Sequence, residues 1–265
     1  MFILFFRLSN MLRWGWLMFF FPVMVISQES EGYGVNLPKF YKQKLHFGFT
    51  LAGNQTDFRV WTVPNTTFPD TVITYNGISN RYKVRRVYSR PGPGFAIGLV
   101  ADVRLHEYIR LRHTPSISFA SRRIEYFLAN NAYDTTRIFQ KTVESTFLIF
   151  PLELKVQSKR LDNFSAYVIG SGGYMMDLAS RKKAAGVSSS GGAYQLDDNV
   201  KLKRDDFFYG GGAGVDFYLT YFKLGFEIKI FSGTRNLLRK ENSIFTNSLD
   251  KVRSRMVIFT VTFEG

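Results

Sequence analysis

The sequence contains no cysteine among its 265 residues. That absence excludes disulfide bonds, thiolate metal sites, a cysteine nucleophile and a lipid anchor on cysteine. No internal segment reaches the roughly 18 consecutive apolar residues of a membrane-spanning helix. Histidine is scarce, with three residues, and no Walker loop, HExxH or GxSxG motif is present. The sequence therefore lacks the common signatures of nucleotide-binding and hydrolytic enzymes.

The chain is instead rich in aromatic residues, which make up 17% of it, and it contains 22 glycines. Many aromatic residues without a long apolar run favour a β-rich protein. The net charge of +14 favours anionic partners, such as lipid phosphate groups, acidic proteins or nucleic acid. Export of the chain would make nucleic acid the least favoured of the three. We expect no cofactor and no small-molecule substrate.

The first 27 residues are typical of a secretory signal peptide. Their only charges are two arginines, and residues 14–26 form an apolar run that is short for a membrane span. We place cleavage before Gln28, with Met11 as an alternative start of translation. An uncleaved membrane anchor is the rival interpretation.

Eight later segments are predicted β-strands; most alternate apolar and polar residues with the period of two that is typical of a strand, whereas the alternation at 164–178 is poor. In the segment 222–230, for example, Phe222, Leu224 and Phe226 share one face, and Lys223 and Glu227 share the other. The eight predicted strands cover residues 45–53, 94–105, 108–121, 145–157, 164–178, 207–219, 222–230 and 255–264.

The connections between these strands help to decide which face meets water. Short connections at 106–107, 158–163 and 220–221 alternate with long ones at 54–93, 122–144, 179–206 and 233–254. Outer-membrane barrels alternate short periplasmic turns with long extracellular loops in this way, and they turn their apolar face to lipid. A soluble sheet would turn that face to a core, but the interior of an eight-stranded barrel is narrow and suits small residues better than phenylalanines.

We therefore predict an all-β protein, an eight-stranded antiparallel outer-membrane barrel with both chain ends on the periplasmic side. The predicted domains are a signal peptide at 1–27, a short periplasmic segment at 28–44 and the barrel at 45–265.

Charged residues on the inward face of such a barrel must pair, because a buried unpaired charge is costly. We predict a lumen ion-pair network of Asp102, Arg104, Arg110, Arg112, Glu153, Lys155, Asp216, Lys223, Glu227 and Lys229. The simpler interpretation is a polar plug that holds the barrel rigid. The alternative is a path for protons or solutes.

Pro115 and Pro151 lie inside neighbouring predicted strands, although proline cannot donate to a β-ladder and is usually excluded from central strands. We predict a wall bulge at these two residues. The alternative is a weak seam in the wall that contacts a partner.

The three histidines argue against catalysis. We expect His46 to face inward near the periplasmic end, His106 to lie in a periplasmic turn and His113 to face lipid. A lipid-modifying or proteolytic barrel needs a histidine beside Ser, Asp or Glu near the outer rim. We therefore expect no catalytic, metal-binding or cofactor-binding residues, and we interpret the glycines of "GGGAG" at 210–214 as space-saving residues of a strand.

Two predicted loops carry basic clusters. The residues are Arg81, Lys83, Arg85, Arg86 and Arg90 in the first loop, and Arg181, Lys182, Lys183, Lys201, Lys203 and Arg204 in the third. Charge exposed to solvent is the simplest interpretation, and contact with lipopolysaccharide phosphates is the alternative.

Four segments also resemble a known family. They are "PGFAIGLVADVRL", "RLRHTPSISFASRRIEY", "FPLELKVQSKR" and "VDFYLTYFKLGFEIKI". In order and spacing they resemble PorT, a family of outer-membrane barrels of the type IX secretion system that is linked to gliding motility. The resemblance runs from about Leu45 to Glu264 and does not include the third long loop.

The resemblance implies a non-enzymatic component that acts with other secretion-system proteins to export proteins bearing C-terminal sorting domains. The alternative function is a general OmpA-like barrel that stabilises the envelope or binds lipopolysaccharide. A lipid A-modifying enzyme is disfavoured by the expected positions of the histidines.

Overall fold

The computed structural model describes residues 35–38, 40, 43–63, 71–75, 78–130, 135–179, 202–239 and 244–265. The fold described below is that of the compact unit Asn36–Gly265. The predicted signal peptide and most of the predicted periplasmic segment lie outside the described residues, as do residues 180–201 of the third predicted loop. Within the described ranges, no helix is long and apolar enough to cross a membrane.

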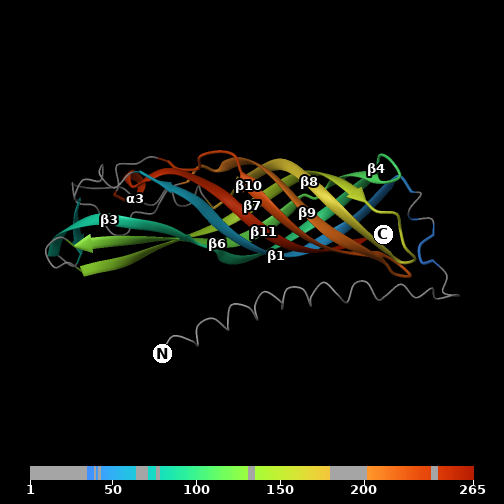
Figure 1. Cartoon of the computed structure of the whole chain (residues 1–265), viewed down its shortest axis with the longest axis horizontal. Coiled ribbons are helices and arrows are strands. Elements are labelled where there is room, and N and C mark those ends of the chain that lie inside the picture. Colours follow the sequence, from blue (N-terminus) through green and yellow to red (C-terminus); the bar gives the residue numbers. More distant parts are fainter. Residues whose placement is uncertain are drawn as a thin grey trace, which may run out of the picture. The chain divides into compact units, whose positions relative to one another are not determined.

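The described residues form eleven strands and one short helix (Figure 1). Their bounds are β1 Leu45–Thr62, β2 Thr71–Tyr75, β3 Ile78–Arg90, β4 Gly92–Arg104, β5 Ile109–His113, β6 Ser116–Asn130, β7 Thr135–Gln157, β8 Phe164–Asp177, β9 Asp205–Tyr218, β10 Lys223–Gly233, α3 Ile244–Asn247 and β11 Leu249–Glu264.

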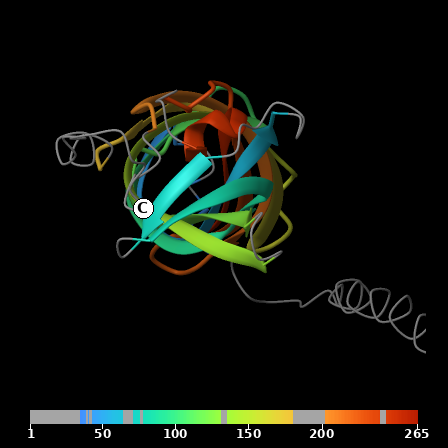
Figure 2. The ribbon, with the colours of Figure 1, turned by 90° about the vertical axis from the view of Figure 1, so that its left-hand side faces the viewer.

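The strands form one antiparallel sheet that closes on itself (Figure 2). β1 pairs with β11 on one side and with β4 on the other. β5 and β6 act as one interrupted strand, because both pair with β4 and with β7. The closed ring therefore has eight strands, which confirms the predicted fold class. β3 continues the line of β4 alongside β6, and β2 pairs with β3 beyond the ring.

The strands are staggered around the ring. Following directly paired residues once around it leads from Phe47 to Asp57, ten residues farther along β1. Such a stagger tilts the strands relative to the barrel axis. It also brings side chains that are distant in the sequence to one level of the lumen.

The two ends of the barrel differ. At one end lie the short connections and both chain ends of the barrel, where the backbone N–H of Gly265 donates to the carbonyl of Phe47 over 3.0 Å. At the other end several strands continue well past their predicted limits, so that β6 reaches Asn130 and β7 begins at Thr135 (Figure 1). Much of what the sequence predicted as long loops is therefore strand.

The residue types on the outer and inner faces of the barrel change places along the strands. In the half with short turns, large apolar side chains cover the outside: Phe47 is 61% exposed and Leu99 65%, whereas Thr262 on the inside is 1% exposed. Farther along β11, Val252 is fully buried and Arg255 faces outward. A membrane barrel requires the first arrangement and a water-surrounded sheet requires the second. The chain therefore has a lipid-facing apolar band and a polar-surfaced extension beyond it.

The lumen is filled in layers, whose order can be read along β7 and β11. Charged side chains come first from the short-turn end. An apolar cluster follows, formed by Ala120, Phe147, Ile149, Met175, Phe208, Phe231, Met256 and Ile258. A second apolar cluster, here called the outer cap, closes the extension and consists of Phe58, Val84, Ile124, Tyr126, Leu128, Val143, Leu202, Leu237, Leu238, Phe245, Leu249 and Val252.

The predicted wall bulge at Pro115 and Pro151 is wrong. The ladder is interrupted there, but His113 pairs with Leu152 and Ser116 pairs with Ile149, so both strands advance by the same number of residues across the gap. A bulge would require an extra residue on one strand. The pairing gap lies between β5/β6 and β7, where His113 Nδ1 lies 2.7 Å from the Pro151 carbonyl oxygen, whereas on the β4 side the N–H of Leu99 donates to the Pro115 carbonyl over 3.0 Å.

Candidate functional site

Ten charged side chains fill the lumen at the short-turn end, and each is at most 4% exposed. They come from six of the eight strands of the ring, because every second residue of a strand points inward. Five are basic and five are acidic, so the layer is electrically balanced. The bases are Arg110, Arg112, Lys155, Lys223 and Lys229, and the acids are Asp102, Glu153, Asp216, Glu227 and Glu264.

Arg112 lies at the centre of this layer. Its Nε donates to Glu153 Oε2 over 2.8 Å, and its Nη2 donates to Glu227. Lys229 Nζ contacts the remaining oxygens of the same two carboxylates, at 2.9 Å from Glu153 Oε1 and 2.7 Å from Glu227 Oε1. These four side chains form a closed ring of charge-assisted contacts from β5, β7 and β10.

A second group of ion pairs lies toward the chain ends. Lys155 Nζ lies 2.6 Å from Asp216 Oδ2. Lys223 Nζ lies 2.6 Å from Glu264 Oε2 and 3.7 Å from Asp216 Oδ2, so it joins two acids. The Tyr167 hydroxyl donates to Glu227 over 3.1 Å, and Lys155 Nζ lies 3.7 Å from the centre of the Tyr167 ring. Tyr167 thus connects the two groups.

The structure brings together nine of the ten predicted network residues. Arg110 and Asp102 form a pair of their own, with Nε 2.7 Å from Oδ1. Arg104 differs from the others because it is only half-buried, at the short-turn end. Sequence reasoning missed Glu264, although that residue continues the inward alternation of the last predicted strand.

A further buried cation, Arg122, lies between the two apolar clusters. Its guanidinium stacks between the rings of Phe58 and Phe147, at 4.1 and 4.8 Å from their centres. It donates to Ser145 Oγ over 2.7 Å and to Asp177 Oδ2 over 3.3 Å. The sequence assigned Arg122 to a loop, and only the extended β6 places it in the lumen.

Residues that precede β1 in the chain cover the mouth of the barrel at the short-turn end. Phe40 is 6% exposed and stacks on His46, with ring centres 3.6 Å apart. The backbone N–H of Asn36 donates to Asn163 Oδ1 over 2.9 Å, and Arg160 donates to the carbonyl of Leu37. The described residues Asn36, Leu37 and Phe40 therefore lie over the lumen at this end.

The histidines are placed as the sequence predicted. His46 is buried in the lumen, His106 is exposed in the turn after β4, and His113 is exposed on the outer face. In the part of the chain that the structure describes, none of them is hydrogen-bonded to a Ser, Asp or Glu side chain. Within the same residues, no three His, Asp or Glu side chains are arranged to hold a metal ion.

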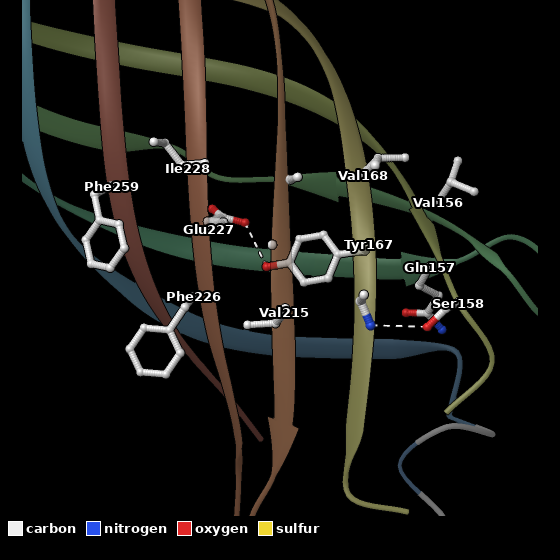
Figure 3. A pocket seen from close by; sticks show the side chains of 13 residues that line it. Val156, Gln157, Ser158, Tyr167, Val168, Val215, Phe226, Glu227, Ile228 and Phe259 are labelled. Carbon is white, nitrogen blue, oxygen red and sulfur yellow. Dashed lines mark hydrogen bonds between the residues drawn. The ribbon is translucent and has the colours of Figure 1, made fainter. Parts of the chain in front are cut away.

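One groove of about 800 Å³ lies on the wall of the barrel (Figure 3). Its rim consists of outward-facing apolar side chains, among them Val168, Ile228 and Phe259, and its floor contains small residues such as Ala213. Figure 3 shows Tyr167 directed to Glu227, with which it forms the lumen contact described above. The groove is therefore an apolar depression in the lipid-facing surface.

A family comparison agrees with this architecture. Residues 27–239 match the family described as outer membrane protein beta-barrel domain. The chain belongs to this family. It is a protein of the cell outer membrane, and its lipid-facing apolar band is the part that the bilayer surrounds. No curated protein matches the sequence.

Several solved structures are similar to the chain at low identity. Neisserial surface protein A is 10% identical with a TM-score of 0.35, and the alignment includes 81% of this chain and 95% of that protein. OprG from Pseudomonas aeruginosa is 15% identical with a TM-score of 0.35, and the alignment includes 84% of this chain and 96% of OprG. Ail of Yersinia pestis is 12% identical with a TM-score of 0.33, and the alignment includes 84% of this chain and 100% of Ail.

Proposed function

We propose that this chain is a closed, non-catalytic barrel that serves as an outer-membrane component of protein export by the type IX secretion system. Its cargo would be proteins with C-terminal sorting domains, and a role in gliding motility would follow from the same machinery. Other secretion-system proteins would be its partners, together with the surrounding lipid. The proposal assigns it no nucleic acid, small-molecule substrate or cofactor.

The filled lumen is the observation that carries the proposal. The balanced charged layer, the first apolar cluster and the outer cap occupy successive levels of the lumen, and Phe40 covers the short-turn mouth. A barrel filled in this way offers no passage for a folded cargo, so it must act through the surfaces it presents. The resemblance of four of its segments to PorT supports the choice of machinery.

The positions of the histidines support a non-catalytic role. Acid–base or nucleophilic catalysis needs a base within hydrogen-bond reach of its partner. His46 instead stacks on an aromatic ring, and His113 contacts a backbone carbonyl in the wall. Substituting each histidine singly with Gln should leave the modification state of lipid A unchanged, as measured by mass spectrometry of extracted lipid A.

Deleting the gene tests the export role. Secreted protease should fall in the medium and accumulate in the periplasm, and the intact gene should restore export. A strain that expresses an unrelated outer-membrane barrel controls for general envelope damage. Normal export in the deletion strain would contradict the proposal.

A general envelope-stabilising barrel that binds lipopolysaccharide is the second candidate. A specific observation favours it, namely the concentration of outward-facing arginines directly beyond the apolar band on β1, β3, β6 and β11. Deletion would then leave export normal and increase sensitivity to detergents and to large antibiotics. Measuring both phenotypes in one strain separates the two functions.

A further inference from the structure

Six basic side chains face outward where the apolar band ends. On β1 the outward residues change from Leu51 to Gln55, Asp57 and Arg59, and on β6 they change from Phe119 to Arg123. The same change occurs along β11, and between β4, whose outward residue Phe95 belongs to the band, and β3, which ends at the outward Arg90. We refer to these six residues as the basic belt: Arg59, Arg90, Arg123, Lys251, Arg253 and Arg255.

The belt is continuous around one side of the barrel. β11 pairs with β1 and β3 pairs with β6, and the backbone N–H of Phe58 on β1 donates to Ser89 Oγ on β3 over 2.9 Å. The four strands therefore lie next to one another at this level. The belt is one surface with basic residues on every strand.

Two arginine pairs in the belt face each other directly across the sheet. Arg59 is the paired residue of Arg253, and Arg90 is the paired residue of Arg123. Side chains that are directly opposite in an antiparallel pair have Cβ atoms about 4.5–5.5 Å apart, and like charges at that separation destabilise the sheet. An anion held between the guanidinium groups would remove this repulsion.

The carboxylates near the belt neutralise only part of it. Arg255 pairs with Asp57 at 3.4 Å and Arg90 pairs with Glu125 at 3.0 Å. For Arg59, Arg123 and Arg253, no carboxylate among the described residues lies within ion-pair distance. Arg253 Nε is in addition buried without a hydrogen-bond partner in this part of the chain. The belt therefore has donors available for an anion.

The surroundings of the belt indicate where that anion comes from. Phe95 and Phe119 stack on the outer wall just below it, with ring centres 5.0 Å apart, and both are exposed on the lipid-facing apolar band. Trp61, a residue type common at the membrane–water interface, lies 5.7 Å from the Arg253 guanidinium. An anion attached to acyl chains can contact the belt and the apolar band together.

We propose that the basic belt binds the phosphate groups of phosphorylated lipid A in the outer leaflet. Arginine forms two parallel hydrogen bonds with a phosphate, which suits the facing pairs Arg59–Arg253 and Arg90–Arg123. The acyl chains of the same molecule would lie against the phenylalanines below. The inference rests on the outer-membrane location and gives a site to the lipid partner of the proposed function, but it does not depend on the secretion role.

Binding can be measured on the purified mature protein in phosphate-free nanodiscs, with lipid A titrated and retention followed by native mass spectrometry. The test variant is Arg59→Gln/Arg253→Gln. The control is Lys44→Gln/Lys159→Gln, which removes the same charge from exposed lysines at the opposite end of the barrel. Since the variant loses the charge-assisted hydrogen bonds of two arginines, we expect lipid A to bind it at least about tenfold more weakly, and to bind the control unchanged.

Two further probes identify the ligand. Lipid A with its phosphates removed should bind the native protein about as weakly as lipid A binds the test variant. Inorganic phosphate at the same concentration should not displace lipid A. Equal binding of lipid A by the native protein and the test variant would overturn the proposal, as would equal binding of dephosphorylated lipid A or displacement by inorganic phosphate. Heat-dependent gel mobility verifies that each variant is folded, and Arg90→Gln/Arg123→Gln replaces the first variant if that one does not fold.

Discussion

Replacing Arg112 with Met tests whether the charged layer holds the barrel together. Arg112 is fully buried, forms close ion pairs with Glu153 and Glu227, and lies 3.9 Å from Glu264, a third buried carboxylate. Methionine is unbranched and uncharged but shorter than arginine, so it removes all three ion pairs and fills only part of the space. The substitution leaves Glu153 and Glu227 with Lys229 as their shared partner.

The expected magnitude follows from those contacts. Removing one partner of a buried ion pair costs about 3–5 kcal/mol, because the other charge stays buried and is no longer compensated. Lys229 reduces the loss, since it already contacts both carboxylates. We expect the free energy of unfolding to fall by about 3 kcal/mol. Arg112→Met combined with Glu227→Gln should recover part of the loss, because it restores charge balance in the layer.

Urea unfolding of the protein folded into lipid vesicles, followed by circular dichroism, measures both changes. The two variants must be compared in the same lipid at the same pH. A decrease below about 1 kcal/mol for Arg112→Met would refute the reasoning, because it would place the pair in the range of exposed salt bridges. If the double variant is no more stable than Arg112→Met alone, charge imbalance is not the cause of the loss.

Three further test substitutions, two of them with a matched control, probe other levels of the structure by the same unfolding measurement. Leu99→Lys places a charge on the lipid-facing band and should cost about 2–4 kcal/mol, whereas Gln55→Lys beyond the band should be nearly neutral. Gly48→Ala should destabilise by about 1–3 kcal/mol, because its Cβ would lie 1.9 Å from the Phe263 carbonyl oxygen, and Gly170→Ala should not, because nothing lies within 4 Å. Phe245→Ala should cost about 3–5 kcal/mol in the outer cap and should make the extension sensitive to protease while the membrane band stays resistant. Equal effects within either matched pair, or unchanged protease resistance for the last variant, would contradict these assignments.

The alternation of residue types determined much of the fold. In segment 222–230 every second residue is apolar, and the structure places those side chains outside and Lys223, Glu227 and Lys229 in the lumen. The prediction succeeds because the face to which a side chain points is a local property of a strand, fixed by the backbone geometry of each residue. The number of strands and the fold class followed from counting such segments and their connections.

Sequence reasoning failed where strands left the membrane. The extended parts of β6 and β7 also alternate, but with mostly apolar residues facing inward and mostly polar residues facing outward. This is the reverse of the arrangement within the membrane, so the two faces exchange residue types at the bilayer surface. Arg122 was assigned to a loop for this reason. The bulge at Pro115 and Pro151 was wrong because proline removes a hydrogen-bond donor without requiring an extra residue in the strand.

The sequence alone therefore determined which residues face the lumen, and the tertiary structure decided which of them meet. Arg112 and Glu227 are 115 residues apart in the chain, and no local pattern relates them. Their contact depends on closure of the ring and on its ten-residue stagger, which set the relative height of every strand. The same closure places Arg59 opposite Arg253, because the pairing of the first and last strands exists only once the sheet has curved into a barrel.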